Sequence, residues 1–471
     1  MGFKTVVLAA GKGTRFKSEL PKVLHPILGK PMLWYVVKAA LEAGSEEVIV
    51  VVGHKRELVE EFLRENYPQV KTVYQSRQLG TGHAVAQCRE LLKNYSGKVV
   101  VLNGDTPLVR PEDIKAVAST PGDMVVLTAK TEDPTGYGRV VRDGNAVLKI
   151  VEEKDATPEE RLITEINTGI YAFSAEPLFR ALEQIDNNNA QGEYYLPDVL
   201  KVFQKEGLSV VPVLTSDFES VMGVNNRHQL AAAESVMRDR IVKELQLSGV
   251  TVHNPQTVYV EPDVTVEPDV ELFGPLYLRG KTVIKKGTVV GPFCDIRDSF
   301  IGEGCTVESH CWMSGATLKG GASCGPFSRL REGTVLEGGS RVGSFVETKK
   351  AHLKEGAKAN HLTYLGDCTV GENTNVGAGT ITCNYDGFAK WRTEIGRNVF
   401  VGSNTLFIAP VKVGDGAITA AGSVITRDVP DNALAVARSK QVNYPGKAES
   451  VREKARKRAE EARGDNPRQN S

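Results

Sequence analysis

A six-residue repeat of apolar side chains dominates the C-terminal half of the chain, from about Val252 to Val436. A period of six fits neither the 3.6-residue period of an α-helix nor the alternation of a strand. It is typical of a parallel β-helix, in which three hexads form one triangular coil and inward-facing side chains stack. The sequence therefore predicts roughly ten coils of about 18 residues each. The repeat positions are Val258, Val264, Val270, Leu276, Ile301, Val307, Met313, Ile395, Val401, Phe407, Val413, Thr419 and Ile425.

Length and composition restrict the class of protein. At 471 residues the chain is too long for one compact core, so about two to four domains are expected. Basic and acidic residues number 58 each, and this balance favours neither nucleic acid nor an anionic membrane as a partner. No signal peptide and no long apolar run are visible, so we expect a cytoplasmic protein without membrane insertion. The seven cysteines form no CxxC pair, which predicts free thiols rather than a zinc cage.

The N-terminal half alternates short β-branched runs with helical stretches. This alternation predicts an α/β fold, a Rossmann-like and mostly parallel sheet that binds its ligand beyond the carboxyl ends of the strands. Three later runs are predicted as an antiparallel second lobe over the same cleft, at 137–141, 147–152 and 168–173. The expected strands are 3–8, 47–52, 70–74, 99–103 and 124–129, and the expected helices are 31–43, 58–66 and 83–93.

The apolar spacing at 227–245 predicts a helix that connects the two halves. We therefore expect a domain at 1–226, a helical linker at 227–247 and a β-helix domain at 248–446. A charged tail at 447–471 is expected to be solvated or partly disordered.

A glycine-rich loop, LAAGKGTR at residues 8–15, directly follows the first predicted strand. Its backbone amides can approach phosphate oxygens closely, and Lys12 and Arg15 supply positive charge. The loop is neither a Walker motif nor GxGxxG, since Phe16 stands where the third glycine would be, so kinase and dehydrogenase activities lose support. Taken alone, such a loop is a tight turn about as often as a ligand site.

Further motifs follow in order: LPK at 20–22, Gln75, LGTGHA at 79–84 and GDT at 104–106. Together they resemble the sugar-1-phosphate nucleotidylyltransferases. This resemblance implies Mg²⁺ held by Asp105 and Asn225, and phosphates held by Arg15 and Lys22 as catalytic cations. It also implies that Gln75, Gly80 and Thr81 contact uracil, and that Gly138, Glu152 and Asn167 contact the sugar. The implied nucleotide-sugar site is completed by Leu8, Ala9, Ala10, Gly11 and Asn103. At Asn103 relatives commonly carry tyrosine or serine, so a role of its backbone is expected.

Within the repeat, HLTYLGD at 361–367 and NVGAGTITCNYDG at 375–387 interrupt the hexads with polar side chains. With the N-terminal motifs, they resemble the bacterial bifunctional N-acetylglucosamine-1-phosphate uridyltransferase and glucosamine-1-phosphate acetyltransferase family over nearly the whole chain. Members of this family make UDP-N-acetylglucosamine for peptidoglycan, lipopolysaccharide and other cell-wall precursors. The resemblance implies a left-handed β-helix, a homotrimer, and UTP, N-acetylglucosamine-1-phosphate, glucosamine-1-phosphate and acetyl-CoA as substrates.

The same resemblance implies the residues of the acetyl-transfer site. An ammonium cannot attack a thioester, so a base must take its proton, and histidine titrates close enough to neutrality to do so. The implied base is His361, and the implied residues for the sugar phosphate are Arg331, Lys349, Tyr364 and Asn375. Arg329 is the neighbouring alternative to Arg331. The implied acetyl-CoA residues are Ala378, Asn384, Tyr385, Ser403, Ala421 and Arg438, with Ser403 also a candidate donor to the thioester oxygen.

Two alternatives remain open from the sequence. The first is a single-activity nucleotidylyltransferase whose β-helix only oligomerises or regulates, as in ADP-glucose synthesis; His361 and the NYDG segment argue against it. The second is a non-catalytic assembly subunit, because translation-factor subunits share this two-part layout. The joint presence of Arg15, Lys22 and Asp105 argues against that alternative.

Overall fold

The computed structural model describes residues 2–464, and the contacts between residues divide the chain after Gly321 into two units. Each unit is described by itself. The end of the predicted tail, residues 465–471, lies outside the described part, as does Met1. No helix within residues 2–464 is both long and apolar enough to cross a membrane.

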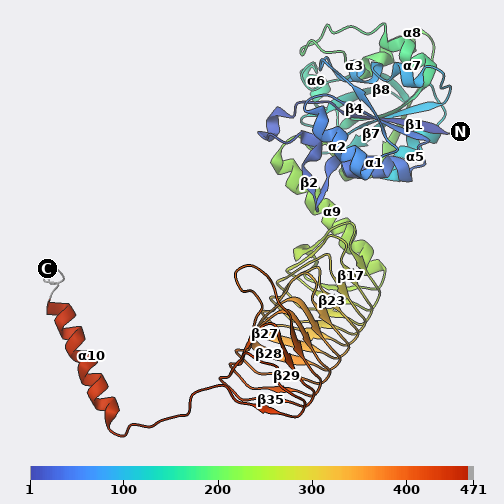
Figure 1. Ribbon diagram of the computed structural model, residues 1–471. Helices are drawn as coiled ribbons and strands as arrows, with labels where there is room; N and C mark the ends of the chain where they lie inside the picture. The colour runs from blue at the N-terminus through green and yellow to red at the C-terminus, as the bar shows by residue number, and fades with distance from the viewer. Residues whose placement is uncertain (1, 465–471) are drawn as a thin grey trace. The chain divides into compact units, whose positions relative to one another are not determined.

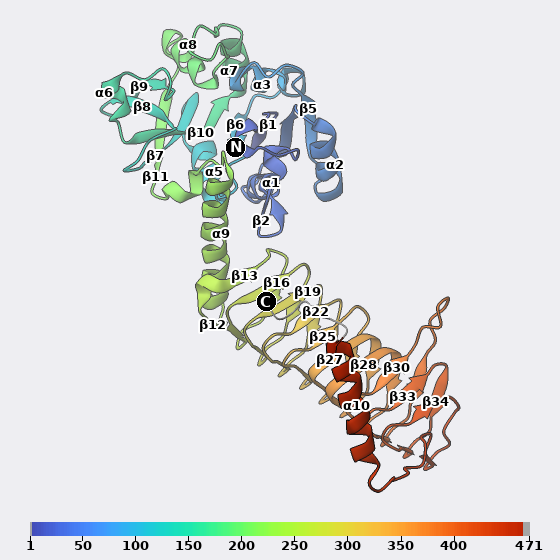
Figure 2. The ribbon, with the colours of Figure 1, turned by 90° about the vertical axis from the view of Figure 1, so that its left-hand side faces the viewer.

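The first unit contains a nine-stranded sheet with the order β11-β7-β10-β6-β1-β4-β5, to which β8 and β9 are attached through β10 (Figure 1 and Figure 2). Strand β1 pairs in parallel with both β4 and β6, whereas β10 runs antiparallel to β6 and β7. The predicted parallel sheet with an antiparallel second part is therefore present. The strands are β1 (Phe3–Ala9), β4 (Glu47–Val52), β5 (Lys71–Tyr74), β6 (Lys98–Asn103), β7 (Met124–Lys130), β8 (Gly138–Asp143), β9 (Ala146–Val151), β10 (Glu165–Ser174) and β11 (Val210–Thr215), with a separate hairpin of β2 (Pro26–Ile27) and β3 (Lys30–Pro31).

Helices cover both faces of this sheet. Successive residues of a strand point to opposite faces, so Val7 packs in one apolar cluster and its neighbour Val6 in another. Helices α1 (Met32–Glu42), α2 (Arg56–Asn66) and α5 (Pro111–Ser119) contribute to the cluster of Val7. Helices α3 (Thr81–Ala86), α4 (Arg89–Leu92), α7 (Ala175–Leu182) and α8 (Val199–Lys205) contribute to the cluster of Val6. The remaining short helix, α6 (Pro158–Arg161), begins with a capping box at Thr157.

The predicted connecting helix is α9 (Arg227–Leu247). It begins where the Asn226 side chain accepts a hydrogen bond from the Gln229 amide, an ordinary helix N-cap. Its apolar stripe packs beside Phe16 and Ile27, and the stripe consists of Leu230, Ala233, Val236, Met237 and Ile241.

The repeat region of the first unit forms short strands that pair in parallel with the strand three further along the chain, as β12 does with β15. Three strands thus complete one coil, as the hexads predict. These strands are β12 (Thr251–His253), β13 (Val258–Val260), β14 (Thr265–Val266), β15 (Glu271–Phe273), β16 (Leu276–Arg279), β17 (Val283–Ile284), β18 (Val289–Val290), β19 (Cys294–Arg297), β20 (Phe300–Ile301), β21 (Thr306–Val307), β22 (Trp312–Ser314) and β23 (Thr317–Leu318).

The second unit continues the same kind of coil. Its strands are β24 (Ser323–Cys324), β25 (Arg329–Leu330), β26 (Val335–Leu336), β27 (Arg341–Leu353), β28 (Lys358–Val370), β29 (Asn375–Val376), β30 (Ile381–Cys383), β31 (Thr393–Ile395), β32 (Phe400–Val401), β33 (Leu406–Ile408), β34 (Val411–Val413), β35 (Ile418–Thr419), β36 (Val424–Ile425) and β37 (Leu434–Ala435). The polar stretch that interrupts the hexads stays in regular parallel pairing, because β28 pairs with β27 along its length. The real irregularity is an inserted loop at residues 384–392, between β30 and β31.

The predicted repeat positions are buried with one exception. Val264 is partly exposed because it precedes β14, where Val266 occupies the inward position. The seven cysteines are free thiols, six of them buried. Where the sequence suggested a solvated or partly disordered tail, the structure places an exposed helix, α10 (Lys447–Gly464).

Candidate functional site

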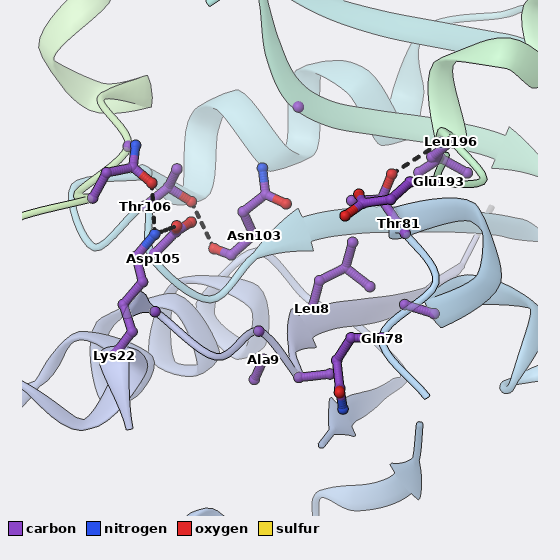
Figure 3. Close-up of a pocket in the computed structure, with 18 of the residues that line it drawn as sticks. Leu8, Ala9, Lys22, Gln78, Thr81, Asn103, Asp105, Thr106, Glu193 and Leu196 are labelled. Carbon is purple, nitrogen blue, oxygen red and sulfur yellow. Dashed lines mark hydrogen bonds and ion pairs between the residues drawn. The ribbon is translucent and has the colours of Figure 1, made fainter. Parts of the chain in front are cut away.

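A cavity of about 980 Å³ opens at the carboxyl ends of the parallel strands in the first unit. Part of its wall is shown in Figure 3. Every residue that the resemblance implies for the nucleotide-sugar site lies in this wall, although the residues come from distant parts of the chain. They are Leu8, Ala9, Ala10, Gly11, Arg15, Lys22, Gln75, Gly80, Thr81, Asn103, Asp105, Gly138, Glu152, Asn167 and Asn225.

Strand register brings the first motifs together. Leu8 at the end of β1 pairs with Asn103 at the end of β6, and the amide of Gly104 donates to the Leu8 carbonyl at 2.9 Å. The glycine-rich loop and the Asp105 loop therefore leave the sheet side by side. The Asn103 carbonyl accepts from the Thr106 hydroxyl at 2.7 Å, so the backbone of this residue shapes the turn.

The glycine-rich loop passes close to Lys22, and Gly13 makes this approach feasible. Gly13 has a φ of 60°, and a Cβ at this position would lie 2.6 Å from the Lys22 Cβ. Any other residue would therefore be strained and would push Lys22 away.

Lys22 is the centre of a charged cluster in the cavity. Its ammonium forms an ion pair with Asp105 and donates to the side-chain oxygen Oδ1 of Asn225 at 2.8 Å. Lys22 and Asp105 point toward one another in Figure 3. Arg15 donates to the same Asn225 oxygen at 2.8 Å. The side-chain oxygens of Asp105 and Asn225 thus both contact the Lys22 ammonium, with the Arg15 guanidinium beside them.

The pair of oxygens at Asp105 and Asn225 suits a hard divalent cation. Mg²⁺ is commonly held by one or two protein oxygens, with phosphate and water oxygens completing its shell. The Lys22 ammonium contacts both oxygens, which shows that they are close enough to share a positive charge. Residues 2–464 contain no cluster of three or more His, Cys, Asp or Glu side chains that could form a metal cage.

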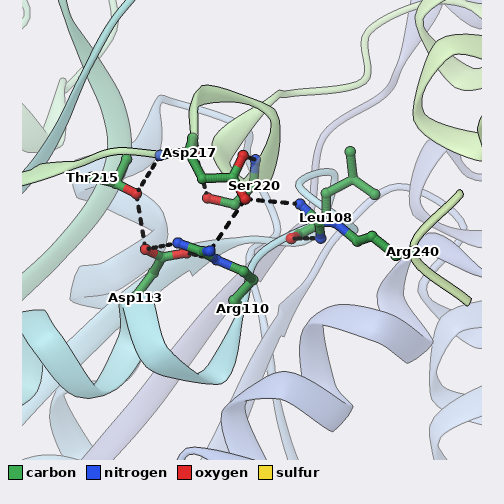
Figure 4. Close-up of polar contacts among 7 residues, drawn as sticks. All are labelled: Leu108, Arg110, Asp113, Thr215, Asp217, Ser220 and Arg240. Atoms are coloured by element: carbon green, nitrogen blue, oxygen red, sulfur yellow. Dashed lines mark hydrogen bonds and ion pairs between the residues drawn. The ribbon is translucent and has the colours of Figure 1, made fainter. Parts of the chain in front are cut away.

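A polar network outside the cavity wall connects the loop that follows Asp105 to the segment that precedes Asn225 (Figure 4). Arg240 of α9 donates to the Leu108 carbonyl at 2.7 Å and contacts Asp217 at 3.3 Å. Asp217 also pairs with Arg110, whose guanidinium bonds Asp113. The Asp105 loop is thereby tied to α9, and the segment that holds Asn225 lies between Asp217 and α9.

The sugar side of the cavity is built on β8, β9 and β10. A Cβ on Gly138 would lie 3.3 Å from the Glu152 carboxylate, so glycine leaves the space between Glu152 and Asn167 open. Burial raises the pKa of Glu152, and the nearby Asp155 and Asp198 add to this effect. Tyr171, which is 2% exposed, exchanges two hydrogen bonds with the Asn167 amide at 2.6 and 2.9 Å.

Sequence reasoning missed several residues of this cavity, including Gln78, Tyr171 and Glu193. Tyr171 lies within a buried strand, where an aromatic residue is ordinary, and no local pattern marks it. Only its contact with Asn167 shows its place in the wall.

In the second unit, strand register aligns His361 with the residues implied for acetyl-CoA. The pairs Lys358–Asn375, Asn375–Phe400 and Phe400–Ile418 are in register. Strands β29, β32 and β35 end one residue later, whereas β28 continues through His361. At the same offset from these positions stand His361, Ala378, Ser403 and Ala421. The Arg438 guanidinium donates to the Ala421 carbonyl at 2.7 Å and extends this column, which we call the corner column.

Cations gather beside Glu347 on the neighbouring face. Arg331 contacts Glu347 at 2.9 Å and Arg329 contacts it at 3.6 Å, so both arginines lie on one side. The nearby Lys390 ammonium, and then Arg331, lower the pKa of Lys349, which places Lys390 in the same group. Sequence reasoning missed Lys390 because it lies on the inserted loop.

The other implied residues lie on adjacent elements. Tyr364 pairs in register with Glu347, Asn375 starts β29, and Asn384 donates to Asp367 at 2.5 Å. Tyr385 lies on the inserted loop, at the corner after β30, and not in the corner column. The structure therefore brings most of the implied acetyl-transfer residues onto neighbouring coils.

Comparisons with known proteins cover both units. A nucleotidyl transferase family matches residues 4–219, and a bacterial transferase hexapeptide family of six repeats matches residues 392–427. The bifunctional protein GlmU of a Thermus thermophilus strain is 50% identical over 446 residues, which is 94% of this chain and 98% of that protein. The chain belongs to the bifunctional GlmU family. The GlmU proteins of an Exiguobacterium strain and of Streptococcus mutans are 47% and 46% identical, each over 94% of this chain and 98% or 97% of their own lengths.

This membership decides between the alternatives left by the sequence, because the match includes the β-helix as well as the nucleotidyl transferase part. The protein is a bifunctional enzyme of UDP-N-acetylglucosamine synthesis, a uridyltransferase and a glucosamine-1-phosphate acetyltransferase. Its substrates are those of the family: the sugar phosphate, UTP and acetyl-CoA.

Proposed function

We propose that uridylyl transfer takes place in the cavity of the first unit and is carried by the cluster around Lys22. A phosphate oxygen of N-acetylglucosamine-1-phosphate attacks the α-phosphorus of UTP, and pyrophosphate leaves. Two anions must meet, so positive charge at the phosphates is the main requirement. The observation that supports this assignment is the contact of Lys22 with Asp105 and Asn225, with Arg15 beside them.

Asp105 and Asn225 would hold Mg²⁺, which would neutralise charge on the phosphate oxygens of the nucleotide. When substrate enters, Lys22 can leave these oxygens and turn to a phosphate, as an ammonium on a flexible stem allows. Arg15 offers a planar set of N–H donors to the same phosphates.

The two sides of the cavity would orient the two substrates. Gln75, Gly80 and Thr81 would hold the uracil edge. Gly138, Glu152 and Asn167 would hold the sugar. The raised pKa of Glu152 favours a carboxyl group that exchanges hydrogen bonds with sugar hydroxyls rather than a free charge. Tyr171 would keep the Asn167 amide in place.

Acetyl transfer would use the corner column. His361 takes a proton from the amine of glucosamine-1-phosphate, the nitrogen attacks the thioester carbonyl of acetyl-CoA, and the coenzyme thiolate leaves. Ser403 would donate to the carbonyl oxygen as negative charge develops there. Arg331, Lys349 and Lys390 would bind the sugar phosphate, since their mutual repulsion is relieved by an anion. Tyr364 and Asn375 would orient the sugar, and Ala378, Asn384, Tyr385, Ala421 and Arg438 would line the coenzyme groove.

The enzyme would act as a homotrimer in which adjacent copies complete each acetyl-transfer site. His361 is exposed at the corner of a single coil stack, and its neighbour Leu362 is 65% exposed. Phe345, at the matching place on the preceding coil, is 64% exposed and stacks on Phe327. Apolar side chains beside a catalytic histidine favour cover by a second copy.

The proposed domain bounds are 1–226 for uridylyl transfer, 227–247 for the linker, 248–446 for acetyl transfer and 447–471 for the tail. Seven free cysteines support a cytoplasmic location, where thiols stay reduced.

The test is one reaction with glucosamine-1-phosphate, acetyl-CoA, UTP and Mg²⁺, in which free thiol and pyrophosphate are followed together and each substrate is omitted in turn. Thiol should appear without UTP, and pyrophosphate should appear only when the acetylated sugar has formed. Pyrophosphate release without any thiol would contradict the acetyl-transfer assignment.

A further inference from the structure

Gln75 contacts a histidine that does not line the cavity, and this contact has a consequence for the nucleotide base. We propose that His83 is a positioning residue that fixes the orientation of the Gln75 amide and thereby makes the site accept uracil and reject cytosine. This inference rests on the proposed role of Gln75 at the uracil edge.

The backbone of Gln75 is held firmly, so only its side-chain amide can turn. Gln75 follows β5 and continues the sheet, where its N–H donates to the Val52 carbonyl at 2.8 Å. Its own carbonyl accepts from the Gln78 side chain at 3.2 Å. The residue is 3% exposed, yet it contributes to the cavity wall.

Two acceptors determine which end of the Gln75 amide points away from the cavity, into the protein. The Gln75 Nε2 lies 3.2 Å from the Gly80 carbonyl oxygen, which can only accept, so the NH₂ group must face it. The same Nε2 lies 2.9 Å from His83 Nδ1. Since the amide donates both its protons inward, the His83 ring must accept at Nδ1 and carry its proton at Nε2.

Two amide groups compete for the acceptor nitrogen of the His83 ring. Burial lowers the pKa of His83, which keeps the ring neutral and Nδ1 able to accept. On the far side, the Gln87 Nε2 donates to the His83 carbonyl at 3.0 Å and lies 3.3 Å from His83 Nε2, so a second NH₂ group faces the ring. A neutral ring has one acceptor nitrogen, and the shorter contact, at 2.9 Å to Gln75, assigns it to Nδ1. Reversing the Gln75 amide would instead oppose its oxygen to the Gly80 oxygen and to His83 Nδ1.

The remaining group of Gln75 decides the base. Within the described residues the Gln75 Oε1 has no hydrogen-bond partner. Because both acceptors hold the NH₂ group on the protein side, this oxygen is directed toward the cavity. An acceptor in the wall matches the N3–H of uracil. Cytosine presents a bare N3 acceptor at the same place, so the two lone pairs would oppose each other. A loosened amide could turn its NH₂ outward and serve cytosine.

The experiment compares UTP and CTP as substrates of the full-length enzyme, using pyrophosphate release and the ratio of the two kcat/KM values. His83→Leu removes the acceptor at Nδ1 while keeping a side chain of similar shape. His83→Asn keeps an acceptor near that position, since its Oδ1 can replace Nδ1. We expect His83→Leu to lower the UTP preference by about tenfold or more, and His83→Asn to retain it.

Gln75→Ala separates this inference from the role of Gln75 itself. If Gln75→Ala lowers the UTP preference but His83→Leu leaves it unchanged, the role of His83 is wrong and that of Gln75 stands. If Gln75→Ala leaves the preference unchanged, the uracil assignment fails and the inference fails with it. An equal loss of rate with UTP and CTP in His83→Leu, without rescue by His83→Asn, would show a merely structural role and overturn the inference.

Discussion

Replacing His361 with alanine tests the separation of the two activities most directly. His361 is exposed on β28, opposite Ser344 in register, and its side chain has no hydrogen bond recorded within residues 2–464. The substitution therefore removes no buried contact, and we expect the free energy of unfolding to change by no more than about 0.5 kcal/mol. Any large functional effect would then come from the chemistry.

The size of that effect follows from the role of a general base. Proton transfer by a positioned side chain contributes about a hundredfold to ten-thousandfold in rate, or roughly 3–5 kcal/mol of barrier. We expect His361→Ala to lower kcat of acetyl transfer within this range. Uridylyl transfer should keep its rate, because its residues all lie in the first unit.

Two separate assays with purified variants follow free thiol from glucosamine-1-phosphate and acetyl-CoA, and pyrophosphate from supplied N-acetylglucosamine-1-phosphate and UTP. His352→Ala is a matched control, since His352 also lies on a long strand of the second unit but bonds Glu337 at 2.7 Å, away from the corner column. It should keep most of its acetyl-transfer rate. A folded His361→Ala protein with normal thiol release, or one that loses both activities, would refute the reasoning.

Three further outcomes are expected. Asp105→Ala should remove nearly all Mg²⁺-dependent pyrophosphate release and leave thiol release unchanged; equal damage to both would show coupling between the sites. Arg240→Met removes charge-assisted bonds to the Leu108 carbonyl and Asp217, and should lower the unfolding free energy in urea by about 1–2 kcal/mol, whereas an unchanged midpoint would contradict the network. Hydrogen bonds from the Ala389 amide, the Trp391 indole and the Phe388 amide lower the pKa of Asp386 from its ordinary 3.8 to about 2. Because the folded-state pKa is depressed, stabilisation of the inserted loop should persist above pH 3.8 and be lost as pH falls toward about 2. The loss should appear as a change in Trp391 fluorescence, and Asp386→Asn should show the same change already at pH 7.

Local patterns predicted most of the sheet and its helices. The strand expected at 47–52 is β4 with those bounds, because a short β-branched run that is buried on both faces favours a parallel strand. The helix expected at 83–93 is divided into α3 and α4. There the amides of Gln87 and Cys88 bond to carbonyls three residues back, a tighter turn that apolar spacing does not reveal.

The sequence revealed the candidate sites only because its motifs resemble those of a known family. The motifs identified Lys22, Asp105 and Asn225, but nothing in the sequence measures the contacts among them. The sequence assigned no role to Lys390, which lies on the inserted loop, or to His83, although His83 belongs to the LGTGHA motif. Each meets its neighbour only in the folded chain, Lys390 beside Lys349 and His83 beside Gln75.

By itself, the sequence determined the architecture of the two parts. The six-residue repeat of apolar side chains and the alternation of strand-like with helix-like segments are both local properties of the chain. It also determined which residue types could perform phosphate and acyl chemistry. Only the tertiary structure decided which of them meet, because strand register sets the corner column and hydrogen bonds behind the cavity set the orientation of each side chain. Register and side-chain orientation depend on partners far along the chain, and such partners are fixed only when the whole fold is packed.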